Sequence, residues 1–118
     1  ALINSDFDMG YKINREMLHR LIIDNGYYSS FESCIYPGVK IKYYYNELLN
    51  NKGICNCESK CTGKGINNDC KKITIAVFNS GKIMITGGSS YKHVEIGYKF
   101  ITDFIKKHEE LIKMKEIE

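Results

Sequence analysis

The sequence lacks the features that mark several classes of protein. No apolar run approaches the roughly 18 residues that a membrane-spanning helix needs, and no basic start followed by an apolar segment indicates a secretory signal. We therefore expect a protein that is neither inserted in a membrane nor secreted. The formal net charge of +3 over 118 residues is also well below the basic excess that by itself indicates a nucleic-acid binder.

Length and composition set the scale of the fold. A chain of 118 residues allows one domain with one core, and 43% hydrophobic with 26% charged residues is typical of an ordinary globular domain. Isoleucine, lysine, asparagine and tyrosine together supply 51 of the 118 residues. All four have A/T-rich codons, which indicates an A/T-rich coding genome.

The spacing of the apolar residues divides the chain into strands and helices. Alternation predicts strands, spacings of three and four residues predict helices, and the only proline, in Tyr36-Pro37-Gly38, predicts the tip of a hairpin. The predicted elements are a strand over 1–9, a helix over 13–23, an extended run over 28–36, strands over 39–45, 73–78 and 82–86, and one long helix from 90 to the charged end at 113–118.

This order of strand, helix, four strands and helix predicts an α+β domain, a curved antiparallel five-stranded sheet with two helices packed on one face. Alternation along the strands turns the isoleucines, the valines and Tyr43 toward the helices. The residues predicted to point the other way are Lys40, Lys42, Tyr44, Thr74, Ala76, Phe78, Lys82, Met84 and Thr86.

The outward-pointing set is neither a core nor a well-solvated surface, because it combines Phe, Met, Ala and Thr with flanking lysines. Such a face is typical of one that binds an anionic ligand with apolar edges. The alternative is a face covered by a partner protein or by a second copy of the chain.

Two segments carry a resemblance to a known family. They are residues 31–39, FESCIYPGV, and residues 75–87, IAVFNSGKIMITG. Together they resemble the core signature of one repeat of the TATA-binding protein family, in which an aromatic-Pro-Gly hairpin tip is followed by an aliphatic-Phe-x-Ser-Gly-Lys-x-x-x-Thr-Gly hairpin. The similarity covers nearly the whole chain apart from the cysteine-rich stretch and the last helical turns. It implies a divergent member, from a virus or another A/T-rich genome.

The resemblance implies a transcription initiation factor whose concave sheet face sits in the minor groove of A/T-rich, TATA-like double-stranded DNA and bends it. The implied DNA-binding residues are the wedges Tyr36 and Phe78, the groove floor Ala76, Met84 and Thr86, and the phosphate contacts Lys42 and Lys82, with Lys40 and Asn4 on the same face.

Two matches are imperfect. Tyrosine replaces phenylalanine at position 36, which should weaken that wedge because its hydroxyl needs a hydrogen-bond partner between bases. The family's asparagine on the first strand falls nearest to Leu2, two residues before Asn4.

The family uses two tandem repeats in one chain, whereas this sequence has material for one. We therefore expect either a homodimer that pairs edge to edge or a piece of a longer two-repeat protein, and the start of the chain, flush with the first predicted strand, favours the piece. The other partners implied are transcription factors or RNA polymerase subunits, and the implied location is the nucleus or a cytoplasmic viral factory.

Four of the five cysteines fall in a polar insert over 46–71 that has no periodicity: Cys55, Cys57, Cys61 and Cys70. Without a secretory signal a disulfide framework is disfavoured. The spacing C-x-C-x3-C-x8-C is not that of a standard zinc ribbon or finger. Nevertheless, four thiols interleaved with glycines can enclose one tetrahedral structural Zn²⁺. We rank zinc above disulfides and disulfides above free thiols, and expect Cys34 to lie in the sheet, outside the site.

Other polar residues have plainer interpretations. Four lysines in and directly after the insert are either extra phosphate contacts or a solvated charge cluster: Lys60, Lys64, Lys71 and Lys72. His19, His93 and His108 lie on predicted helices, and no spacing joins them to a cysteine or carboxylate in a catalytic pattern, so we expect no enzyme. We expect Asp6 and Asp8 on a solvated edge. The alternative function is a protein-interaction or substrate-positioning module of a larger assembly or enzyme, without independent TATA recognition.

Overall fold

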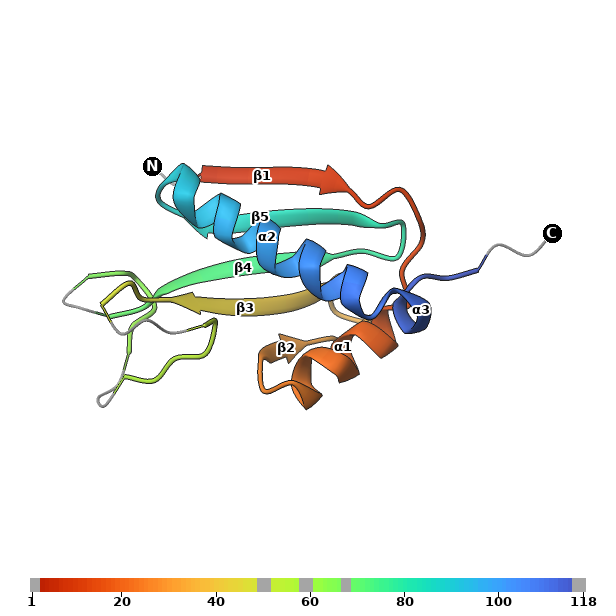
Figure 1. Cartoon of the computed structure of the whole chain (residues 1–118), viewed down its shortest axis with the longest axis horizontal. Helices are drawn as coiled ribbons and strands as arrows, with labels where there is room; N and C mark the ends of the chain where they lie inside the picture. Colours follow the sequence, from red (N-terminus) through yellow and green to blue (C-terminus); the bar gives the residue numbers. More distant parts are fainter. Residues whose placement is uncertain (1–2, 49–51, 58–60, 67–68, 116–118) are drawn as a thin grey trace.

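A computed structural model describes residues 3–48, 52–57, 61–66 and 69–115. Five antiparallel strands form one sheet, and the helices lie on one side of it (Figure 1). In chain order the elements are β1 (Ile3–Asp8), α1 (Arg15–Asp24), β2 (Tyr28–Ser30), β3 (Val39–Tyr45), β4 (Lys71–Val77), β5 (Lys82–Gly88), α2 (Tyr91–Lys107) and α3 (Glu109–Ile112). The predicted α+β class and the order of the strands are confirmed.

The sheet order is β1-β5-β4-β3-β2, so β1 and β2 form its two edges. Strands β2, β3 and β4 each pair with the next strand along the chain, whereas β1 pairs with β5, far away in the sequence. In Figure 1, α2 runs obliquely across the strands and α1 lies beside β2. Contacts place α2 on β4 and β5, and α1 on β2 and β3.

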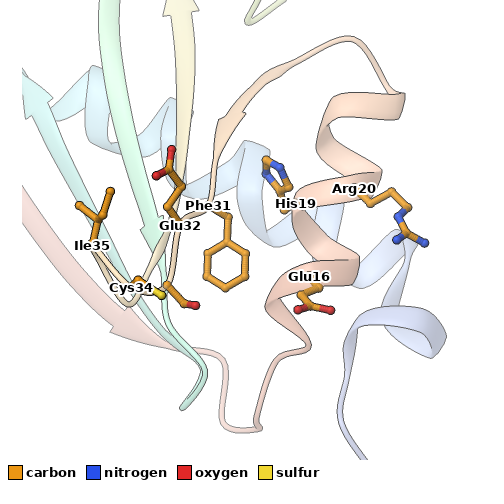
Figure 2. Close-up of a pocket in the computed structure, with 8 residues that line it drawn as sticks. Glu16, His19, Arg20, Phe31, Glu32, Cys34 and Ile35 are labelled. Carbon is orange, nitrogen blue, oxygen red and sulfur yellow. The ribbon is translucent and has the colours of Figure 1, made fainter.

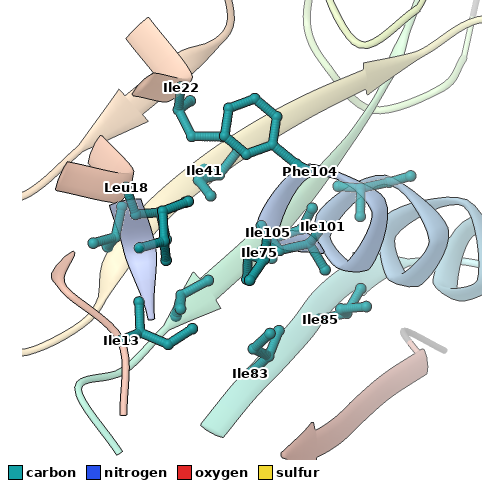
Figure 3. Packing of buried hydrophobic residues seen from close by; sticks show 14 residues of the cluster. Ile13, Leu18, Ile22, Ile41, Ile75, Ile83, Ile85, Ile101, Phe104 and Ile105 are labelled. Carbon is teal, nitrogen blue, oxygen red and sulfur yellow. The ribbon is translucent and has the colours of Figure 1, made fainter. Parts of the chain in front are cut away.

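The core lies between the sheet and the helices (Figure 3). Most of the predicted inward residues of the three central strands have no solvent exposure: Val39, Ile41, Ile73, Ile75, Val77, Ile83 and Ile85. Tyr43, also predicted to point inward, is partly buried and packs against this core. Helix α2 approaches this layer closely because it carries Gly97, where a Cβ would lie 3.2 Å from Ile85 and 3.3 Å from Ile73. The predicted assignment of the two sheet faces is therefore correct.

The first helix begins two residues later than predicted. Asn14 caps it, since its side-chain oxygen accepts the backbone N–H of Met17 at 3.1 Å. Ile13 precedes the cap in extended backbone and pairs with Lys113 in an isolated bridge, with its side chain fully buried. Its apolar character thus reflects a core position outside the helix.

The predicted single long C-terminal helix is broken. Helix α2 ends at Lys107, His108 lies at the junction, and α3 is a separate short helix. The break turns Ile112 back into the core, where it is fully buried and its carbonyl accepts the N–H of Asn14 at 2.8 Å. None of the helices in the described part of the chain is long and apolar enough to cross a membrane.

The predicted extended run over 28–36 stops early, because only Tyr28–Ser30 pairs with β3. The chain then turns, with the N–H groups of Ile35 and Tyr36 both directed to the carbonyl of Glu32. Cys34 is therefore exposed in a turn, and the prediction that it lies in the sheet is wrong. Figure 2 shows Cys34 and Ile35 on this turn, across a shallow pocket from α1.

Truncating the core should be far more costly than truncating the turn. We expect Ile75→Ala to lower the free energy of unfolding by about 2–5 kcal/mol, because it leaves a cavity under α2. Ile35→Ala, at a side chain that is 79% exposed, should change it by less than about 0.5 kcal/mol. Urea unfolding of both variants measures the difference, and equal losses would contradict the assignment of the core.

Candidate nucleic-acid interface and cysteine cluster

The face of the sheet without helices, here called the outer face, carries two rows of side chains that cross the strands. One row consists of Ser30, Lys40, Ala76, Met84 and Asp6; the next consists of Tyr28, Lys42, Thr74 and Thr86. Ala76 is only 6% exposed although it lies on the outer face, because the longer side chains of Lys40 and Met84 stand directly opposite it. The middle of the face is thus a floor of small and apolar groups.

Two aromatic rings meet at one end of the outer face. The ring centroids of Tyr36 and Phe78 lie 5.8 Å apart at an interplanar angle of 53°. Gly38 lies against both rings, since a Cβ there would be 3.0 Å from a ring carbon of each. The ammonium of Lys40 lies 4.2 Å from the centroid of Tyr36. The two residues predicted as wedges are therefore neighbours, and a basic group accompanies them.

Arg15 holds the turn that carries Tyr36. Its guanidinium lies 5.0 Å from the ring centroid of Phe31 and donates a hydrogen bond to the carbonyl of Pro37. The contact joins α1 to the tip of the hairpin, so the position of Tyr36 depends on the helix side of the domain as well as on the sheet. Sequence patterns give no signal for this long-range contact.

The edge of the outer face formed by β1 is acidic. Asn4, Asp6 and Asp8 are exposed on β1, and Asn4 lies at an irregularity in the pairing of β1 with β5. The Lys82 ammonium lies 3.7 Å from a carboxylate oxygen of Asp6, in a pair whose side chains are 51% and 65% exposed. Asp6 and Asp8 are on a solvated edge, as predicted, but they share the face with the predicted phosphate contacts.

A second aromatic pair lies at the other end of the strands, and the sequence analysis did not single it out. The rings of Tyr28 and Tyr44 are 5.2 Å apart and nearly perpendicular, and Lys72 lies directly opposite Tyr44 in the pairing of β3 with β4. Continuing the alternation of β4 backward from Thr74 to Lys72 would have placed Lys72 on the outer face, beside this aromatic pair. Leu2, the position nearest the family's asparagine, and Lys60 of the insert lie outside the described residues.

The four cysteines of the insert come together in the structure. The sulfur atoms of Cys55, Cys57, Cys61 and Cys70 all lie within 4.8 Å of one another, and those of Cys57 and Cys70 are 3.6 Å apart. A tetrahedral site with Zn–S bonds of about 2.3 Å places its sulfurs about 3.8 Å apart. A disulfide needs about 2.05 Å, and none of these cysteines is bonded to another. The group has the composition and spacing to hold one metal ion.

The insert is fixed to the ends of β3 and β4 by backbone hydrogen bonds. Tyr44 donates to the carbonyl of Gly53 at 2.9 Å, and Lys72 donates to the carbonyl of Gly63 at 2.8 Å. These bonds extend the sheet locally on both sides of the β3–β4 pair. The segments that carry the first three cysteines are thereby held against the start of β4, where Cys70 is buried.

The surroundings shift the pKa values of Cys70 and Cys61 in opposite directions. Burial raises the pKa of the Cys70 thiol to about 12, and hydrogen bonds with Cys57 and Cys55 add to this. Burial also acts to raise the pKa of Cys61, but hydrogen bonds from the backbone N–H groups of Gly63 and Cys70, together with those from Cys57 and Cys55, lower that pKa overall. The N–H of Cys70 is 3.2 Å from the Cys61 sulfur. The protein therefore supplies donors for at least one thiolate, the form that metals bind.

None of the three histidines belongs to this cluster. His19 on α1 has its Nδ1 2.7 Å from the hydroxyl of Ser29, and on α2 the Nδ1 of His93 accepts the N–H of Ser89 at 3.0 Å. His108 caps α2 instead of lying within a helix as predicted. In the regions that the structure covers, no histidine belongs to a group that could hold a metal.

The fold and the outer face together define a class of protein, an α+β repeat in which helices cover one side of a five-stranded sheet. On the other side of the sheet, small side chains lie between lysines and aromatic rings. Residues 4–108 match the family model of "Transcription factor TFIID (or TATA-binding protein, TBP)". The chain therefore belongs to the TATA-binding protein family, a family of DNA-binding transcription factors, as a single divergent repeat.

A relative is the "TATA-box-binding protein-like" protein of Acanthamoeba polyphaga mimivirus. The two sequences are 28% identical over 121 residues, a stretch that covers 96% of this chain and 28% of the relative. The chain thus spans less than a third of that protein's length. The family and the fold predicted from the two sequence signatures are confirmed.

The contact of Gly38 with the two rings can be tested directly. We expect Gly38→Ala to push the rings of Tyr36 and Phe78 apart and to lower the free energy of unfolding by about 1–3 kcal/mol, because the added methyl overpacks the site. NMR spectra would report shifted ring protons for both residues. Ser33→Ala, exposed in the same turn, is the control; unchanged ring signals in Gly38→Ala would contradict the packing.

Proposed function

We propose that this domain binds A/T-rich duplex DNA in the minor groove through its outer face and bends it, as a factor that serves transcription initiation. The observation that carries the proposal is the pairing of Tyr36 with Phe78 at one end of a floor made by Ala76, Met84 and Thr86. Family membership supports the DNA-binding class. We assign the domain no catalytic role.

The chemistry of the outer face suits the minor groove. A·T pairs present only hydrogen-bond acceptors there, so a protein that reads them needs a close apolar fit with a few donors. Ala76 and Met84 supply the fit, and the hydroxyls of Thr74 and Thr86, directly opposite each other, supply donors. Lys40 and Lys42 are exposed on β3 beside this floor, where they would contact phosphates.

The aromatic pair supplies the bend. Apolar side chains that enter between base steps unstack them and kink the duplex. Phe78 has a fully apolar ring for this role, whereas the hydroxyl of Tyr36 must keep a hydrogen-bond partner. We therefore assign the main wedge to Phe78 and a supporting contact to Tyr36, with Lys40 above its ring directed to the DNA backbone.

A complete binding surface needs a second half. Strand β1 is one of the two edge strands of the sheet and presents Asp6 and Asp8, so it is the edge of this domain less suited to DNA. We propose that a second repeat, or a second copy of the chain, pairs along β1 and extends the sheet. Such a factor would act where the template lies, in the nucleus or a viral factory, with transcription factors or polymerase subunits as further partners.

Loss of the Phe78 ring should abolish most of the bending. We expect Phe78→Ala to bind A/T-rich duplex DNA about 1–3 kcal/mol more weakly, the range for one lost aromatic–base contact, and to bend it far less. Energy transfer between dyes at the two ends of the duplex measures the bend. Tyr91→Ala, at an exposed ring on α2, is the control.

The DNA-bending hypothesis fails if Phe78→Ala bends the duplex as the unmodified protein does. It also fails if a preparation with the second repeat or copy in place does not bind A/T-rich DNA at modest salt. If the hypothesis fails in either way, the alternative is that the outer face belongs to a protein-interaction or substrate-positioning module.

We also propose that the four clustered thiols bind one structural Zn²⁺. Their mutual distances and all-sulfur composition suit a closed tetrahedral site, which orders a segment that lacks a core of its own. The insert over 46–71 then acts as a metal-stabilised addition to the single repeat.

Metal analysis of the purified protein should find about one zinc per chain. We expect Cys70→Ser to lose the metal and Cys34→Ser to keep it, because Cys34 is exposed in the turn after β2, outside the cluster. A chelator should lower the melting temperature of the unmodified protein. Zinc-free protein with an unchanged melting temperature, or equal zinc in the two variants, would refute the site.

A further inference from the structure

The outer face carries a second aromatic and basic group at the end of β3 and β4 away from Phe78. It consists of Tyr28, Lys42, Tyr44 and Lys72, here called the distal patch. Lys42 lies directly opposite Tyr28, and Lys72 directly opposite Tyr44. Six residues separate Lys72 from Phe78, which is about 20 Å along a strand. The two aromatic groups therefore lie at separate points that one duplex can contact together.

No carboxylate lies at the described strand positions that surround the lysines of the distal patch. One row consists of Tyr28, Lys42, Thr74 and Thr86, and the next pair along the strands is Tyr44 with Lys72. Lys82 differs, because its ammonium is 3.7 Å from Asp6. Lys42 and Lys72 thus have no carboxylate directly opposite them in the strand pairing, which leaves their charges to attract phosphate groups.

The cysteine-bearing insert supports the distal patch from the side. Gly63 packs against it, since a Cβ there would lie 3.1 Å from the Cβ of Lys72 and 3.9 Å from a ring carbon of Tyr44. Its carbonyl accepts the N–H of Lys72, and Gly53 accepts that of Tyr44. These contacts join the insert to Lys72 and Tyr44 on both sides of the β3–β4 pair.

We propose that the distal patch is a second contact for the phosphate backbone of DNA, and that metal bound by the four cysteines holds it in position. This inference rests on the proposed DNA-binding function. Lys42 and Lys72 pair with phosphates, and the exposed ring of Tyr28 lies along the sugar edge of the groove. The metal does not contact DNA; it fixes Gly63, on which Lys72 and Tyr44 rest.

The salt dependence of binding tests the phosphate contact. We expect Lys72→Gln, which keeps most of the side-chain length, to lower the slope of log K against log salt by about 0.9, the value for one lost phosphate contact on duplex DNA. Lys99→Gln, an exposed lysine on α2, should leave the slope unchanged. An unchanged slope for Lys72→Gln, with DNA binding intact, would overturn the inference.

The metal requirement is tested in the same assay. Chelated protein and the Cys70→Ser variant should already show the lowered slope of log K against log salt. Introducing Lys72→Gln into either of them should then lower the slope no further. Gly63→Ala should act similarly, because its Cβ would crowd Lys72. Gly10→Ala is its control, since it shares a positive φ but its Cβ would meet nothing within 4 Å. If chelated protein keeps the full slope, the metal does not hold the patch.

The outcomes separate the two proposals. Failure of the unmodified protein to bind A/T-rich duplex DNA sinks the proposed function and this inference together. Binding that depends on Phe78 but not on Lys72 keeps the proposed function and overturns only the distal contact. Circular dichroism of each variant confirms that the fold is retained, so that a lost contact is not confused with unfolding.

Discussion

Burial of the isoleucine-rich side of β3, β4 and β5 beneath the helices is the constraint on which the rest of the structure depends. Side chains in a strand alternate, so fixing one face in the core assigns every remaining side chain to the other. Gly97 strengthens this constraint because it lets α2 settle onto Ile73 and Ile85. The buried layer thus decides which aromatic rings, threonines and lysines the outer face carries.

This dependence explains which parts of the fold the sequence could predict. The inward positions of the central strands and the two family signatures were clear because each rests on a regular local pattern. The turn after Ser30 and the break at His108 were missed because distant contacts decide them: Arg15 with Pro37, and Ile112 with Asn14. Clustering of four cysteines was foreseeable from their spacing, whereas the role of Gly53 and Gly63 in anchoring them required the three-dimensional arrangement.

The distribution of charge on the outer face carries more information than the net charge. Lysines gather on β3 and at the start of β4, and carboxylates stand on β1 at the far edge. Charge on the outer face is therefore distributed unevenly across the sheet, with the positive side at β3 and the negative side at β1. A ligand of high negative charge would be drawn toward β3, and a protein chain that covers β1 would gain from carrying basic side chains there.

The anchoring of the insert bears on how such a domain can change over time. Tyr45 and Lys71 are directly opposite in an antiparallel pair, so the 25 residues between them leave and rejoin the sheet at adjacent points. The entropy of closing a loop grows only slowly with its length, and a long excursion here costs little more than a short one. Loop closure therefore sets little limit on the length of the cysteine-rich segment, and the isoleucine core of the β3–β4 pair does not depend on that length.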